Sequence, residues 1–476
     1  MLLQLIINIL VVVAVSKLAF SIELTFGQRV DYQVGHLPSS VYPVDLNGDG
    51  FVDLVVAHES ASGIWILLNN GNGTFDVAAD YAAGDASLSV IATELNGDRF
   101  DDLVVVNVLT DSVYVLYNDS SGVFPSGSHF AVGGFPHSVI ALDLNGDGYN
   151  DLATANTSTS NVSVLLNSLE YTFDSAEEYD VQSGALSLAA GDFDGDGDND
   201  IGVANIISDN VSVLLNDGNG VFELVGNYNV GEGPHSVIAA DLDNDGYCDL
   251  ATANVFTNDI SVLFSTGDGA FGEAKSIEVG SGPSSLFAAD FSNNGFLDLV
   301  VSTGFADSVA VLLNLGKCNF ILGGRFAVGH IPIAVSATDL DNNGAIDIVV
   351  ANTGSDYITV IMNVSMPEPH GRPQTWVDCE LFDGVITPAA FDSESDPFDE
   401  LYSCSTGFRD GTPHISETKP GDTDYNGGRW HKNELKSGIS PDKYVNACSV
   451  EDLDLNDFQS TNDYFECPLL PRRGRN

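Results

Sequence analysis

Short runs of alternating apolar and polar residues, bounded by polar turns, follow one another along most of the chain. In the first unit, Ser39 to Leu46 and Val52 to Val56 have the composition of strands and flank an acidic turn. Ile64 to Leu68 follows a second turn, and a turn rich in Gly and Asn then leads into Thr74 to Tyr81. The pattern therefore predicts four short antiparallel strands in each unit.

The unit recurs every 49 residues without an insertion. An acidic motif marks each copy and begins at Asp45, Glu94, Asp143, Asp192, Asp241, Asp290 and Asp339. A phenylalanine keeps the same spacing and stands at Phe26, Phe75, Phe124, Phe173, Phe222, Phe271 and Phe320. Self-similarity at this period is typical of stacked or circular repeat folds. Seven units of four antiparallel strands predict an all-β fold, the seven-bladed β-propeller.

The two ends of the array predict that the propeller is a closed ring. The chain enters with a copy of the fourth strand around Phe26 and leaves after a copy of the third strand, Tyr357 to Met362. We expect the N-terminal strand to complete the last blade, because a closed ring leaves no edge strand open to another chain. A linear solenoid would instead carry atypical capping repeats. The predicted propeller spans residues 22–365.

Two further segments flank the propeller. Residues 1–21 hold an apolar run, Leu2 to Val15, followed by Ala19-Phe20-Ser21, which fits the cleavage site of a signal peptide. Because basic residues are missing before this run, an uncleaved membrane anchor is the alternative. Residues 366–476 break the repeat and predict a small cysteine-containing module of mixed or mainly β character.

The cysteines indicate an oxidising compartment for the last segment. Cys379, Cys404, Cys448 and Cys467 predict two disulfides there, in any of three pairings. Cys248 and Cys318 lie in different repeats, where they either pair with each other or remain as buried free thiols.

The chain is strongly acidic, with a formal net charge of −52. Residues 22–365 hold 47 acidic residues against five basic ones. Such a surface repels phosphate backbones, which argues against nucleic acid as a partner. The same surface attracts divalent cations.

The acidic motifs have the composition of calcium-binding loops. The first, Asp45 to Asp53 (DLNGDGFVD), places side-chain oxygens at positions 1, 3, 5 and 9 and a backbone carbonyl at position 7. Oxygen ligands select calcium over zinc or copper, and their number argues against magnesium, which keeps more of its water. One such motif can equally be a solvated hairpin turn, since Asp, Asn and Gly are common in turns. Seven in register predict up to seven calcium ions.

We number the loops 1 to 7 along the chain. The predicted ligands are Asp45, Asn47, Asp49, Phe51 and Asp53 in loop 1; Glu94, Asn96, Asp98 and Asp102 in loop 2; Asp143, Asn145, Asp147, Tyr149 and Asp151 in loop 3; Asp192, Asp194, Asp196, Asp198 and Asp200 in loop 4; Asp241, Asp243, Asp245, Tyr247 and Asp249 in loop 5; Asp290, Ser292, Asn294, Phe296 and Asp298 in loop 6; and Asp339, Asp341, Asn343, Ala345 and Asp347 in loop 7.

The loops differ in expected affinity, because the charge of the ligands tunes calcium binding. Loops 4 and 5 present four carboxylates each and should bind most tightly, whereas loops 1, 3 and 7 present three. Loop 6 should be weak, since Ser292 and Asn294 replace two carboxylates. Of the seven loops, we expect loop 2 to be the one that lacks a bound calcium ion, because Arg99 stands where the other loops have glycine.

At this point the chain resembles the FG-GAP/VCBS repeat family, which includes the propeller of integrin α subunits and a fungal calcium-containing lectin. The resemblance rests on repeats such as GGFPHSVIALDLNGDGYNDLATANTSTSNVSVLLN, Gly133 to Asn167, and covers the propeller. It implies calcium in the hairpin between the first and second strands of each blade. It also implies extracellular adhesion, carbohydrate binding or scaffolding, usually without catalysis.

The sequence favours a secreted or cell-surface calcium-binding propeller that acts in adhesion or ligand binding. The expected partner is an extracellular protein or a glycan, and membrane contact is expected only if the N-terminal segment is uncleaved. His137 and His235 recur in phase in turns that either hydrogen-bond a sugar or only shape the chain. The alternative function is a calcium-dependent enzyme, a lyase or hydrolase acting on polysaccharides, although no catalytic constellation stands out.

Overall fold

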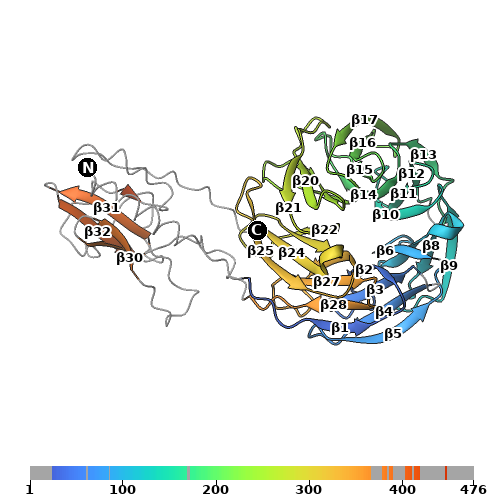
Figure 1. Ribbon diagram of the computed structural model, residues 1–476, viewed down its shortest axis with the longest axis horizontal. Coiled ribbons are helices and arrows are strands. Elements are labelled where there is room, and N and C mark those ends of the chain that lie inside the picture. Colours follow the sequence, from blue (N-terminus) through green and yellow to red (C-terminus); the bar gives the residue numbers. More distant parts are fainter. Residues whose placement is uncertain are drawn as a thin grey trace. The chain divides into compact units, whose positions relative to one another are not determined.

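The computed structural model shows an all-β protein. It describes residues 24–59, 63–84, 86–168 and 172–365, together with the backbone of five strands after residue 377. The chain divides into two compact units, Met1–Pro367 and Glu368–Asn476. The first unit is a seven-bladed β-propeller, which confirms the predicted fold (Figure 1).

Each blade is a sheet of four antiparallel strands, in sequence order in blades 1 to 6, and the first strands of neighbouring blades lie against one another around the axis of the ring. The first strands are β2 (Pro38–Val44), β6 (Ser87–Thr93), β10 (Pro136–Leu142), β14 (Ala185–Gly191), β18 (Pro234–Ala240), β22 (Pro283–Ala289) and β26 (Pro332–Thr338). The second strands are β3 (Asp53–His58), β7 (Asp102–Asn107), β11 (Asp151–Asn156), β15 (Asp200–Asn205), β19 (Asp249–Asn254), β23 (Asp298–Thr303) and β27 (Asp347–Asn352).

The third and fourth strands form the outer part of each blade. The third strands are β4 (Gly63–Asn69), β8 (Ser112–Tyr117), β12 (Asn161–Leu165), β16 (Asn210–Asn216), β20 (Asp259–Leu263), β24 (Ser308–Asn314) and β28 (Tyr357–Ile361). The fourth strands are β5 (Phe75–Tyr81), β9 (Ser126–Ala131), β13 (Glu177–Asp180), β17 (Phe222–Asn229), β21 (Lys275–Glu278), β25 (Phe320–Ala327) and, in the last blade, β1 (Val30–Gln33). Two 3₁₀ turns, η1 (Val108–Thr110) and η2 (Gly304–Ala306), join second to third strands.

The N-terminal strand closes the ring as predicted. β1 pairs with β28 from Val30 opposite Val360 to Gln33 opposite Tyr357, and Phe26 forms an isolated bridge with Asn363 (Figure 1). Blade 7 therefore combines the two ends of the propeller, which removes the open edge that β28 would otherwise present.

The apolar core lies between neighbouring blades rather than within one of them. Every residue of the second strands is buried, because each second strand has a sheet on both faces. One cluster, for example, joins Leu46, Val55 and Ile64 of blade 1 to Val90 and Leu103 of blade 2. Packing between blades is thus the main source of burial.

The periodic phenylalanines also act between blades. Phe124 of blade 2 meets the ring of Tyr81 in blade 1 edge to face, with centroids 5.6 Å apart. Phe75 meets Tyr32 of β1 in the same way at 5.5 Å. Six of the seven periodic phenylalanines make an edge-to-face pair of this kind, which adds to simple apolar burial.

The strand order also separates two faces of the ring. Since successive strands run in opposite directions, the acidic loops and the turns between third and fourth strands lie on one face, which we call the loop face. The turns between second and third strands, and the connections from one blade to the next, lie on the opposite face.

The described strands of the C-terminal unit form two small antiparallel sheets. β29 (Asp378–Phe382) pairs with β30 (Val385–Ala389), and β31 (Ser403–Arg409) lies between β32 (Thr412–Thr418) and β33 (Val445–Asn446). The predicted signal peptide and the four predicted disulfide cysteines of this unit fall outside the residues whose side chains are described. Within the described part of the chain, no helix is both long and apolar enough to cross a bilayer.

Candidate metal centres

All seven acidic loops join the first strand of a blade to the second, where the resemblance placed them. In loop 1, one carboxylate oxygen of Asp45 accepts the backbone N–H groups of Gly48 and Asp49, at 2.9 and 3.2 Å, and the other accepts that of Gly50 at 2.8 Å. Gly50 has φ of 85°, a left-handed conformation that glycine adopts readily. The loop is therefore curled around the position-1 carboxylate by its own hydrogen bonds.

The position-9 aspartate opens each second strand and is buried in every blade. In loop 1, Asp53 accepts the backbone N–H of Leu46 at 3.2 Å and that of Asn69 at 2.8 Å. Burial raises the pKa of Asp53 to about 6 in spite of these hydrogen bonds. Burial likewise raises the pKa of Asp102 and of Asp347 to about 7. A buried carboxylate of this kind favours a cation that would offset its charge.

Three loops bring carboxylate oxygens together at a spacing that suits one ion. In loops 4, 5 and 7 the aspartates at positions 1, 3 and 9 each offer an oxygen, and these oxygens lie within 4.8 Å of one another. Calcium binds oxygen at about 2.3–2.6 Å, so two ligands on opposite sides of one ion stand about 4.8 Å apart. The three groups are Asp192, Asp194 and Asp200; Asp241, Asp243 and Asp249; and Asp339, Asp341 and Asp347.

The remaining predicted ligands share the same loops. In loops 1 and 3 position 3 is an asparagine, and Asn47 and Asn145 each accept the N–H of the position-5 aspartate at 2.9 Å. At position 7 the ring of Phe51 fills the space above Gly71, where a Cβ would lie 2.8 Å from the ring. This contact anchors the residue whose carbonyl is the predicted ligand. Coordination by any of these residues, and a bound ion in any of the seven loops, stay predictions.

Loop 2 departs from the others as the sequence suggested. Arg99 adopts φ of 78°, in the region that glycine occupies at the matching position of the other loops. A residue with a Cβ is strained there by about 1–2 kcal/mol. Asp102 keeps one carboxylate oxygen, Oδ2, buried without a hydrogen-bond partner among the described residues.

We therefore expect Arg99→Gly to raise the stability of the protein by about 1 kcal/mol and to add one bound calcium ion per chain. The matched variant Gly148→Arg places arginine at the same position of loop 3, where φ is 89°, and should remove one ion. Metal analysis after gel filtration at low calcium measures both. Equal calcium content in the two variants, or full calcium density in loop 2 of the unaltered protein, would contradict this.

Sequence reasoning missed a second set of residues that holds the loops together. The backbone N–H of Asn69 binds Asp53, and its side-chain amide donates to the carbonyl of Val52 at 2.9 Å and to that of Leu340, in the loop of the preceding blade, at 2.8 Å. The residues in phase with it are Asn118, Asn167, Asn216, Ser265, Asn314 and Asn363. Each links its own loop to the preceding one, so the seven loops form a continuous ring.

The raised pKa values predict how stability depends on pH. In the metal-free protein these aspartates resist ionisation in the folded state, so their contribution is complete below about pH 4 and is lost as the pH rises through about 6 to 7. The metal-free melting temperature should therefore fall between about pH 4 and pH 7. With calcium bound the trend should reverse, because protons compete with the ion. Calorimetry after exhaustive removal of metal checks this, and a metal-free melting temperature that rises across the interval would refute it.

The cysteines and histidines of the propeller do not extend these centres. Cys248 and Cys318 are free thiols, which decides between the two alternatives left by the sequence, and burial raises the pKa of Cys318 to about 12. His137 and His235 meet at right angles with ring centroids 5.9 Å apart. Burial lowers the pKa of both, that of His137 to about 3, so both rings are neutral at physiological pH.

The fold and the loops together define a β-propeller built from repeats with calcium-type loops. The chain belongs to the FG-GAP-like repeat family, whose repeat matches residues 45–105, 94–154, 143–203, 192–252 and 241–301. This confirms the family suspected from the sequence. Comparison with curated protein sequences finds no match.

Solved structures share the propeller at low sequence identity. BBS1N in complex with ARL6DN has a TM-score of 0.53 at 12% identity, over 72% of this chain and 97% of that one. Virginiamycin B lyase from Staphylococcus aureus has a TM-score of 0.50 at 12% identity, over 71% and 99%. A protein from Lactobacillus plantarum has a TM-score of 0.51 at 17% identity, over 62% and 86%. At these identities the likeness concerns the fold alone.

Proposed function

We propose that this protein is a calcium-stabilised propeller that binds an extracellular ligand, a glycan by preference, and acts in adhesion. The observation that carries the proposal is the difference in chemistry between the loop face and the opposite face of the ring. The loop face concentrates buried carboxylates in a hydrogen-bonded ring, which suits ions that hold the scaffold rigid. The opposite face exposes apolar side chains in a regular pattern, which suits a ligand.

Calcium is the ion that the loops fit best. Their ligands are oxygens only, and loops 4, 5 and 7 each bring three aspartate oxygens within reach of one ion. Zinc prefers nitrogen or sulfur ligands, which the predicted ligand sets of these loops do not include.

The opposite face carries one large apolar side chain per blade, supplied from either of two positions. In blades 2, 4, 5 and 6 it comes from the turn between the second and third strands, and the residue before the first strand is small. In blades 1, 3 and 7 it comes from that residue instead. The seven are Leu37, Leu109, Phe135, Ile207, Phe256, Phe305 and Ile331.

The two positions compensate for each other physically. The ring of Phe256 covers Gly233, where a Cβ would lie 2.5 Å from it, and Phe305 covers Gly282 at the same distance. Side chains at both positions would collide, so each blade has room for one. Phe256 and Phe305 remain 64% and 68% exposed, which is unusual for phenylalanine in a soluble domain. Six of the seven, all except the half-buried Leu37, are exposed, and one such residue per blade marks an interaction surface.

Polar groups stand beside these apolar residues. His36 precedes Leu37 and contacts Asp356 at 2.7 Å, and His330 precedes Ile331 and contacts Asp307 at 3.0 Å. Both pairs are exposed. Sugars present apolar ring faces and many hydroxyls, so aromatic or aliphatic contacts flanked by hydrogen-bonding groups match their chemistry. This combination favours a glycan over a purely apolar ligand.

The setting we propose is outside the cell. Proteins with repeats of this family are often extracellular. Calcium sites of extracellular modules have dissociation constants of about 10⁻⁴ to 10⁻³ M, which suit the calcium concentration there. The predicted signal peptide and disulfides point the same way.

A glycan array tests the proposal, with the full chain applied in calcium and, separately, after metal removal. We expect calcium-dependent binding that Phe256→Ser with Phe305→Ser abolishes. Val77→Ser is the matched control, since Val77 is 52% exposed on the outer strand β5, away from the opposite face. Loss of binding in the control, or no glycan bound in either condition, would overturn the glycan assignment. A parallel turnover assay on acidic polysaccharides tests the enzyme alternative, and cleavage would replace adhesion by catalysis.

A further inference from the structure

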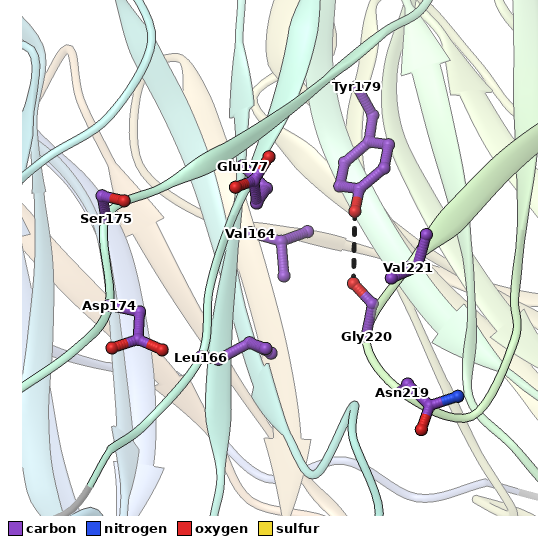
Figure 2. Close-up of a pocket in the computed structure, with 9 residues that line it drawn as sticks. All are labelled: Val164, Leu166, Asp174, Ser175, Glu177, Tyr179, Asn219, Gly220 and Val221. Atoms are coloured by element: carbon purple, nitrogen blue, oxygen red, sulfur yellow. Dashed lines mark hydrogen bonds between the residues drawn. The ribbon is translucent and has the colours of Figure 1, made fainter.

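A cavity of about 290 Å³ opens at the outer rim between blades 3 and 4 (Figure 2). Val164, Leu166 and Val221 form its apolar wall. The polar residues that line it are Asp174, Ser175, Glu177 and Tyr179 from blade 3 and Asn219 from blade 4. The cavity is lined by outer strands and by the turn between the third and fourth strands of blade 4, which lies on the loop face, but none of its lining residues is a predicted metal ligand.

The cavity exists because the outer strand of blade 3 is interrupted. After an isolated bridge between Asn167 and Phe173, the N–H of Asp174 donates to Leu166 O at 2.9 Å, and β13 begins only at Glu177, opposite Val164. In blades 1, 4 and 6 the outer strand instead begins at the periodic phenylalanine and runs on without a break. The interruption leaves room beside the neighbouring blade.

Blade 5 has the same interrupted backbone, and there a lysine occupies the matching place. Its isolated bridge joins Ser265 to Phe271, and β21 begins at Lys275, opposite Val262. Lys275 is in phase with Glu177. Its Nζ donates to the carbonyl of Cys318 at 2.7 Å, across the junction with blade 6.

The acceptor of that lysine also has a counterpart in the cavity. Cys318 is in phase with Gly220, whose carbonyl accepts the hydroxyl of Tyr179 at 3.2 Å (Figure 2). A carbonyl oxygen has two lone pairs, so it can accept a second donor. The junction of blades 5 and 6 therefore shows how an ammonium group on an alkyl chain sits at this place in the fold. At the junction of blades 3 and 4 the residue in phase with Lys275 is Glu177, and Asp174 also lines the cavity.

The electrostatics of the cavity favour a cation. Asp174 and Glu177 add two negative charges, where blade 5 has Gly272 and Lys275. Burial raises the pKa of the Tyr179 hydroxyl, and the nearby Glu177 and Asp217 carboxylates raise it further. The apolar wall distinguishes the site from the loops, because a metal ion gains nothing from contact with Val164 and Leu166 whereas an alkyl chain does.

We propose that this cavity binds a primary alkylammonium group, namely the lysine side chain of a partner polypeptide. The methylenes would lie along Val164, Leu166 and Val221. The ammonium would donate to the Gly220 carbonyl, as that of Lys275 does to Cys318, with Glu177 and Asp174 supplying negative charge at the rim of the cavity. The proposal is independent of the calcium and glycan assignments, so it can fail or hold without them.

Methyl NMR on the full chain in saturating calcium tests it with Nα-acetyl-lysine methylamide as the probe. We expect saturable shifts of the Val164, Leu166 and Val221 methyl resonances. Nα-acetyl-norleucine methylamide has a similar alkyl side chain without the ammonium and should produce none. Pentylammonium, a free amine, tests the source of the ammonium group. If it binds as tightly as the lysine compound, the site takes free amines; if it binds more weakly, the site takes a lysine of a polypeptide. Either result supports an ammonium site. Shifts of equal size with the norleucine compound, or none with either amine, would overturn the proposal.

Three variants locate the site. Asp174→Asn with Glu177→Gln should weaken binding by at least about tenfold, since each removes a charged acceptor. Glu177→Lys should fill the cavity from within, as Lys275 does in blade 5, and abolish binding while the fold is kept. Asp76→Asn is the matched control, because Asp76 is the exposed aspartate in phase with Asp174 in blade 1. Equal loss in this control would mean that only the overall negative charge attracts the probe, which would refute the site.

Discussion

Removal of divalent ions should lower the melting temperature of the propeller by about 10 to 15 °C. Extracellular calcium sites at tenfold saturation stabilise a fold by about 1.4 kcal/mol each, so six or seven sites contribute on the order of 8 to 10 kcal/mol. For a domain of this length the entropy of unfolding is about 2.1 cal/mol/K per residue, which converts that free energy to the stated shift. The buried position-9 aspartates act in the same direction, because without an ion their charges lie in the core unpaired.

Calorimetry in calcium and in EDTA measures this shift, and added calcium should restore it. Asp192→Asn with Asp241→Asn, which weakens loops 4 and 5, should reduce the calcium-dependent part of the stability. Asp76→Asn, outside the loops, should leave that part unchanged. The same melting temperature in EDTA and in calcium would show that the loops are ordinary turns.

Deletion of residues 24–34 should cost at least about 5 kcal/mol of stability and cause self-association. The segment supplies β1, the ring of Phe26 against Phe326 at 4.6 Å, and the ring of Tyr32 against Phe75 at 5.5 Å. Burial of a large apolar side chain contributes about 1.5–3 kcal/mol, so these rings and the ladder together give the estimate. Without β1, the edge of β28 is open to pair with a second chain.

Urea unfolding and analytical ultracentrifugation measure the two effects. Deletion of residues 1–23, which lie before the closing segment, is the control and should change neither. If the longer deletion does not fold, Tyr32→Ala tests the same packing with an expected loss of about 2 kcal/mol. A stable monomer that lacks residues 24–34 would mean that the blade does not need its fourth strand.

The sequence allowed most of the fold to be predicted, because the pattern of each strand recurs in every repeat at the same spacing, so each strand assignment is supported several times. Closure followed from the phase alone: a fourth-strand copy at Phe26 lacks a partner unless it joins Tyr357 to Met362. The interruption of the outer strands in blades 3 and 5 was not predictable in this way. Phe173 and Phe271 keep the period there, and the backbone leaves the ladder only at Asp174 and Gly272.

The candidate sites also differ in how far the sequence allowed them to be predicted. The loop ligands were visible, because chelation uses residues close together in sequence. Asn69 and its counterparts were missed, although they share the period, because their partners lie in the preceding blade. Leu340 and Asn69, for example, meet only when the ring is closed. The cavity beside Glu177 depends on shape between blades, which periodicity cannot report.

Closure by β1 also sets the order in which the molecule can be made. Val30 is among the first propeller residues to be synthesised, yet its partner Val360 is among the last. Blades 1 to 6 can pair their strands as they emerge, whereas the last blade must wait while its outer strand stays without its native partner. A long closure of this kind is slow. The growing chain therefore spends most of its synthesis with an unsatisfied strand near its beginning, which is the point where a folding chaperone would have most to protect.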